Sequence, residues 1–78
     1  MNKYIATFHN HSGALSYYEL LKKLGITAKL TPVPRKVSAS CGTGVYYEHN
    51  AVVDLNNCDL DSVYLDANNT FERMLKKK

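Results

Sequence analysis

The chain has 78 residues, of which 45% are apolar and 22% charged, and its formal net charge is +3. This length gives one small domain and excludes enzymes that close two domains around a substrate. No apolar run reaches the roughly 18 residues that cross a bilayer, and the first residues lack the apolar stretch of a signal peptide, so we expect a cytoplasmic protein without membrane contact.

The first half of the chain predicts a strand, a helix and a second strand. Tyr4–Phe8 alternates and is rich in β-forming residues, which predicts the first strand. A helix follows, capped by Asn10 or Ser12 and stopped by Gly25. Its apolar face is formed by Ala14, Tyr17 or Tyr18, Leu21 and Leu24.

Two prolines end the second strand, which is predicted over Thr27–Thr31. Pro32 and Pro34 lack amide donors, so this segment must leave the sheet or follow its edge. The rest of the pattern predicts a third strand, a helical turn or two and a fourth strand, over Val45–Glu48, Asn50–Asn56 and Ser62–Leu65.

The predicted order is βαββαβ, which favours an α+β, ferredoxin-like sandwich with an antiparallel four-stranded sheet and two helices on one face. A short C-terminal helical tail is predicted after Thr70, where Phe71, Met74 and Leu75 would form an apolar stripe. We therefore expect a domain over residues 1–66 and an extension over 67–78 that is helical and has a basic end.

The distribution of charge leaves the body of the chain neutral. Residues 1–36 hold six basic side chains and one acidic one, residues 37–75 hold one basic and six acidic ones, and three lysines follow. Six tyrosines could form a stacking surface for RNA, but the central region is acidic and no run resembles an RNA-recognition strand. We expect these rings to pack in the core and expect no nucleic-acid partner.

The segment from Pro32 to Gly44 carries the ingredients of a reactive thiol. Cys41 is preceded by prolines and followed by glycines. A reactive cysteine needs its thiolate stabilised by cations, hydroxyl donors or open backbone amides. Arg35 supplies a cation, Ser38 and Ser40 supply hydroxyl groups, and Gly42 leaves the backbone amides open. The residues alone leave a second interpretation open, in which Cys41 is a small buried apolar side chain.

The run Pro-Val-Pro-Arg followed by Ser-x-Ser-Cys-Gly resembles the hallmark of a family of small bacterial selenium/sulfur carrier-like proteins. The resemblance covers Lys3 to Asp66 and includes Thr7-Phe8 and the Gly25-Ile26 turn. It implies a compact α/β domain in which Cys41 holds sulfur or selenium as a persulfide-type group. It further implies roles for Arg35 as charge partner, for Ser38, Ser40 and Gly42 in shaping the loop, and for Pro32 and Pro34 as scaffold. Thr43-Gly44 departs from the apolar residues expected there.

The remaining cysteine and the histidines are weaker candidates. Cys58 precedes Asp59, and an acidic neighbour raises the pKa of a thiol, which argues against a nucleophile there. His9, His11 and His49 could join Cys41 in a zinc site, but their spacing is not a known zinc signature. We expect no metal and no cofactor.

The sequence therefore predicts a carrier that takes sulfur or selenium from a donor protein and hands it to an acceptor protein, rather than a turnover enzyme. The alternative is a structural or protein-interaction module, with a homodimer as one form of it. In that alternative, Cys41 is a packed or redox-sensing thiol and the stripe of Phe71, Met74 and Leu75 supplies the contact.

Overall fold

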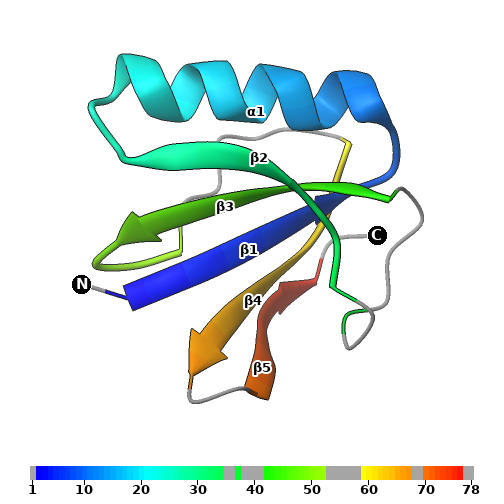
Figure 1. Cartoon of the computed structure of the whole chain (residues 1–78), viewed down its shortest axis with the longest axis vertical. Coiled ribbons are helices and arrows are strands. Elements are labelled where there is room, and N and C mark those ends of the chain that lie inside the picture. Colours follow the sequence, from blue (N-terminus) through cyan, green and yellow to red (C-terminus); the bar gives the residue numbers. More distant parts are fainter. Residues whose placement is uncertain (1, 35–36, 38–41, 53–58, 68–69, 77–78) are drawn as a thin grey trace.

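A computed structural model describes residues 2–34, 37, 42–52, 59–67 and 70–76. These residues form a five-stranded antiparallel sheet with one helix along one side (Figure 1). In chain order the elements are β1 (Asn2–Phe8), α1 (His11–Lys23), β2 (Ala28–Pro32), β3 (Thr43–His49), β4 (Leu60–Ala67) and β5 (Thr70–Lys76). Across the sheet the order is β2-β3-β1-β4-β5.

β1 is the central strand, and its alternation defines the two faces of the sheet. Tyr4, Ala6 and Phe8 belong to the core cluster shared with α1, whereas Ile5 and Thr7 point to the opposite face. All five are buried, as expected of a strand with neighbours on both sides and cover on both faces. The predicted first strand is thus confirmed and starts two residues earlier.

The predicted helix is confirmed, together with its cap and its stop. Asn10 has extended backbone dihedrals, and its side-chain oxygen accepts a hydrogen bond of 2.7 Å from the N–H of Gly13. Ala14, Tyr17 and Leu21 are fully buried on the face toward the sheet. Gly25 ends the helix region with φ of 79°, a left-handed conformation that glycine adopts without strain.

Aromatic side chains hold α1 on the sheet. The Tyr17 ring lies 5.1 Å from the ring of Phe8 and 5.9 Å from that of Tyr47, measured between centroids, and Tyr4 lies 5.3 Å from Tyr47. Tilted contacts at these distances are favourable beyond the area that they bury. The expectation that the tyrosines serve core packing is therefore confirmed for Tyr4, Tyr17 and Tyr47.

The predicted edge behaviour of the second strand is also confirmed. β2 lies at one edge of the sheet and ends at Pro32, whose register partner is Thr43. An edge strand tolerates proline because the missing N–H removes no hydrogen bond from a second neighbour. The third and fourth predicted strands are present as β3 and β4, each longer than expected.

The prediction of a ferredoxin-like sandwich with two helices is wrong. α1 is the only helix among the described residues, and the sheet has five strands rather than four. Of the predicted second helix, residues 50 and 51 form a bend, residue 52 has no regular structure, and residues 53–58 lie outside the described part of the chain. Short helices are marginal without tertiary support. Val52 nonetheless packs against the core.

The predicted C-terminal helix is wrong as well, because residues 70–76 form β5. Arg73 pairs with Tyr64 and Leu75 pairs with Val63, so Met74 is an extra residue at an irregularity between the two pairs. Leu75 consequently packs toward the core, Phe71 faces Asp66 on the other side, and Met74 is exposed. The expected single stripe of Phe71, Met74 and Leu75 does not exist.

No helix in the part of the chain that the structure describes is long and apolar enough to span a membrane.

Candidate functional site

The two ends of the segment that carries Cys41 are tied together at the end of the β2–β3 hairpin. The N–H of Val33 donates to the carbonyl oxygen of Gly42 over 2.9 Å, which continues the pairing of Pro32 with Thr43 by one position. Within the segment, the N–H of Val37 donates to the carbonyl oxygen of Pro34 over 3.0 Å. The Val37 residue is only 5% exposed, so the chain is also anchored by an apolar contact.

Gly44 allows this hairpin to lie close to the central strand. A Cβ atom at this position would be 2.8 Å from the carbonyl oxygen of Ala6, 3.2 Å from Cγ2 of Val33 and 3.5 Å from Cγ1 of Ile5. The first of these contacts is shorter than real Cβ atoms show. The departure at Gly44 therefore has a structural reason, since only glycine fits the space beside β1.

Three of the predicted site residues are described. Pro32 is exposed at the end of β2, Pro34 is half-buried in the turn closed by Val37, and Gly42 is exposed with open space around its Cα. The other four lie outside the described residues, and their predicted roles remain predictions: Arg35, Ser38, Ser40 and Cys41.

The start of α1 meets the same end of the hairpin. Nδ1 of His11, the first residue of α1, lies 3.3 Å from Oγ1 of Thr43, the first residue of β3. The two residues are separated by 32 positions in the chain. The sequence showed a histidine pair near a helix start but carried no signal for this contact. The structure thus brings an imidazole to the base of the segment that holds Cys41.

Asp59 fastens the turn before α1 to the start of β4. Its carbonyl oxygen accepts a hydrogen bond of 2.7 Å from the N–H of His9, and its Oδ1 accepts one of 3.0 Å from Nδ2 of Asn10. Gly13 is packed against the Asp59 side chain so closely that a Cβ atom would overlap it. These contacts fix the position of the helix start relative to the sheet.

The three histidines do not converge. His9 and His11 are exposed at the end of β1 and the start of α1, whereas His49 is at the opposite end of β3 from Thr43, roughly 20 Å away along a strand. Among the described residues, no group of three or more His, Cys, Asp or Glu side chains could hold a metal ion. Cys58, like Cys41, lies outside these residues.

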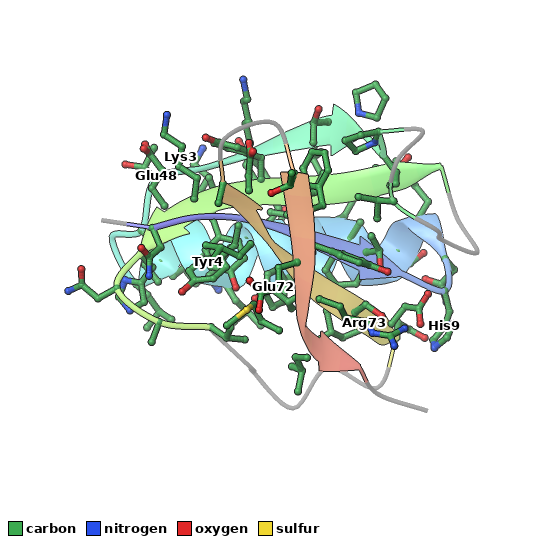
Figure 2. The ribbon with its side chains drawn as sticks, turned by 90° about the horizontal axis from the view of Figure 1, so that it is seen from below. Lys3, Tyr4, His9, Glu48, Glu72 and Arg73 are labelled. Atoms are coloured by element: carbon green, nitrogen blue, oxygen red, sulfur yellow. The ribbon has the colours of Figure 1, made fainter. Side chains whose placement is uncertain are left out.

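The sheet face away from α1 carries a row of side chains that crosses all five strands. By register, its members are Lys29, Tyr46, Ile5, Tyr64 and Arg73. Nζ of Lys29 lies 5.5 Å from the centroid of the Tyr46 ring, within the range of a cation–π contact. Figure 2 shows the molecule from below, with β5 in front of the other strands and Lys3 beside its register partner Glu48.

Burial on this face raises the pKa of Tyr46 above its ordinary value of 10.0; nearby Lys3 lowers it, and Glu48 and Asp66 raise it further. The folded protein thus holds the phenol proton more tightly than the unfolded chain does. The resulting contribution to stability is complete below pH 10 and is lost as pH rises above it. We expect the difference in tyrosinate absorbance between the native protein and Tyr46→Phe to have its midpoint above pH 10.

Two charge variants test the cause of this shift. Lys3→Gln should move the Tyr46 midpoint to higher pH, and Glu48→Gln should move it to lower pH. A midpoint at or below pH 10 in the native protein would contradict the packing described for this face.

Comparison with known proteins assigns the chain to a family. A model of the family described as "Putative Se/S carrier protein-like" matches residues 3–58. This match covers most of the chain and includes β1, α1, β2, β3 and the segment between Pro32 and Gly44. No curated protein and no solved structure matches the chain. The resemblance inferred from the proline-to-cysteine run is confirmed, and the chain belongs to the Se/S carrier protein-like family.

Proposed function

We propose that this protein accepts sulfur or selenium on Cys41 as a persulfide-type group and passes it to a partner protein. The observation that carries the proposal is the family match, which spans the whole segment from Pro32 to Gly44. The anchoring of that segment supports it. The hydrogen bond from Val33 to Gly42 joins the two ends of the segment, and Val37 within it is buried.

The chemistry that this proposal requires is nucleophilic attack by a thiolate. The Cys41 sulfur attacks the outer sulfur of a donor persulfide, the donor S–S bond breaks, and a new S–S bond forms at Cys41. The donor leaves as a thiolate and takes up a proton. Arg35 is proposed as the cation that favours the Cys41 thiolate, with Ser38, Ser40 and Gly42 shaping the loop.

Such a carrier meets separate donor and acceptor proteins and does not turn over a substrate by itself. Residues 1–66 are proposed as the carrier domain and 67–78 as its extension. The competing function, a protein-interaction module or homodimer, lacks the apolar stripe on which it was based. Pairing through the sheet edges is also disfavoured, because β2 ends in Pro32 and β5 carries an irregularity at Met74.

Sulfur loading tests the proposal directly. The native protein, Cys41→Ala and Cys58→Ala are each incubated with a small-molecule persulfide, and intact mass spectrometry counts the added sulfur atoms. We expect Cys58→Ala to gain one sulfur atom at the rate of the native protein. In Cys41→Ala, this fast gain should be lost. Equal loading of Cys41→Ala and the native protein would contradict the carrier function and favour the interaction module.

A further inference from the structure

Two tyrosines of the sheet lie outside the core. Tyr46 on β3 and Tyr64 on β4 are half-buried, and neither belongs to the core cluster between the sheet and α1. Both pair with Ile5 of the central strand, so they lie on the sheet face away from α1, which we call the distal face. Neighbouring strands are about 4.8 Å apart, so about 10 Å separates the two tyrosines. The expectation that the tyrosines serve core packing does not extend to this pair.

Exposed cations surround the two rings. In the row that crosses the sheet, Lys29 on β2 and Arg73 on β5 are the two end members, about 19 Å apart across four strand spacings. Both are exposed, as is Lys3 in the neighbouring row, and Figure 2 shows Lys3 and Arg73 well separated. Nζ of Lys29 lies 5.5 Å from the centroid of the Tyr46 ring. The distal face therefore combines aromatic rings with cations along its whole width.

Two carboxylates share the distal face with these cations. Glu48 is the register partner of Lys3, and Asp66 follows Leu65, the register partner of Tyr4, so the two acids flank Lys3. Both acids are half-buried, whereas the three cations are exposed. An anion that approaches this face consequently meets the cations first, and Lys3 offsets part of the charge of the two carboxylates.

The expectation of no nucleic-acid partner rests on the acidic central region of the sequence, and the fold divides these acids. Asp59 accepts a hydrogen bond from Asn10 at the start of α1. Glu72 pairs with Leu65 and lies on the sheet face toward α1. The acidity of residues 37–75 is therefore not concentrated on the distal face.

We propose that the distal face binds single-stranded nucleic acid, whose bases stack on Tyr46 and Tyr64 and whose phosphates lie near the surrounding cations. Rings and cations together bind single strands because every base has a flat face that stacks and every nucleotide carries a negative charge. Lys29, beside the Tyr46 ring, would contact the phosphate of the nucleotide stacked there. An acidic protein surface would satisfy the cations alone, so the rings favour nucleic acid.

Fluorescence anisotropy tests the proposal with labelled oligouridine and oligothymidine of about 12 nucleotides, at about 50 mM salt. We expect the native protein to bind both strands. Tyr46→Leu should weaken binding by about fivefold or more, the loss expected for one stacked base. Tyr46→Phe retains the ring and should bind within about twofold of the native protein.

The helix offers a matched control for each change. Tyr18 on α1 is also half-buried, and Nζ of Lys22 lies 5.2 Å from the centroid of its ring. Tyr18→Leu should therefore leave binding unchanged. Lys29→Gln should reduce the slope of log affinity against log salt by about 0.7, the share of one phosphate contact, whereas Lys22→Gln should not change the slope.

Thermal melts followed by circular dichroism show whether each variant is folded. Lys29→Gln and Lys22→Gln exchange exposed side chains and should keep the native melting temperature, so the salt slopes test the proposal even if Tyr46→Leu is unstable.

Three results would overturn the proposal. The first is a native protein that binds neither strand. The second is an equal loss in Tyr46→Leu and Tyr18→Leu, which would mean attraction by the overall charge of +3. The third is polyglutamate that displaces the labelled strand as well as an unlabelled strand of equal charge does, which would assign the face to acidic proteins. The measurement uses no sulfur donor and leaves Cys41 unchanged, so this proposal and the carrier function can fail independently.

Discussion

Tyr17→Ala is expected to destabilise the protein by about 3 to 5 kcal/mol, the usual cost of removing a fully buried aromatic side chain. Tyr17 is fully buried and its ring contacts Phe8 and Tyr47 at 5.1 and 5.9 Å, so its loss removes the aromatic contacts between α1 and the sheet. A domain of this size has a total stability of roughly 4 to 12 kcal/mol. Urea unfolding followed by circular dichroism should therefore show a large fraction of unfolded protein at low denaturant.

Leu15→Ala on the same helix is the matched control. Leu15 is 39% exposed, and its truncation should change the free energy of unfolding by less than about 1 kcal/mol. Equal losses in Tyr17→Ala and Leu15→Ala would mean that α1 does not pack through the face described above.

Gly44→Ala is expected to lower the free energy of unfolding by about 2 to 3 kcal/mol, although it adds only one methyl group. The new Cβ atom would be 2.8 Å from the carbonyl oxygen of Ala6, and a backbone atom of the central strand cannot move away cheaply. β3 would instead move away from β1, and the hydrogen-bonded pair of Val33 and Gly42 would move with it. Differential scanning calorimetry would measure the loss as a lower melting temperature.

Gly42→Ala tests the same chemical change two residues earlier. A Cβ atom at Gly42 meets nothing within 4 Å, so the melting temperature should remain within a few degrees of the native value. A larger loss for Gly42→Ala than for Gly44→Ala would contradict the close packing of β3 against β1.

The order of the first four elements could be predicted from sequence because each has a strong local signal. Asn10 and Gly25 mark the two ends of α1 through cap chemistry, and the alternation of Tyr4–Phe8 identifies the central strand. The prolines likewise predicted an edge for β2. These features depend on neighbours in sequence, which is why they could be read without the fold.

The C-terminal strand could not be predicted in this way. Phe71, Met74 and Leu75 have the spacing of an apolar helix face. In the strand that forms instead, the irregularity at Met74 shifts the alternation by one residue, so Phe71 and Leu75 lie on opposite faces. Only the pairing of Leu75 with Val63 distinguishes the two structures, and that pairing depends on a neighbouring strand. The error in the fold class follows from this ambiguity and from the prediction of a second helix over residues 50–56, of which residues 50–52 are not helical.

The sequence predicted which residues would form the candidate site, but not the contacts around it. The run from Pro32 to Gly42 was predicted to be a reactive segment from its residue types and its family resemblance; the family match confirms the resemblance, and the reactivity stays a prediction. The contact of His11 with Thr43 joins residues 32 positions apart and leaves no local pattern. The need for glycine at position 44 also arises from another strand, through the carbonyl oxygen of Ala6.

The central claim, that Cys41 both accepts and releases sulfur, is tested most directly by a two-step transfer with the Cys58→Ala protein. The protein is loaded with a small-molecule persulfide, separated from it, and then mixed with a small-molecule thiol while its intact mass is followed. We predict a gain of one sulfur atom in the first step and its loss in the second, with the protein that carries both Cys41→Ala and Cys58→Ala unchanged throughout. Absence of the first gain, or a loaded sulfur that no thiol removes, would contradict a carrier function.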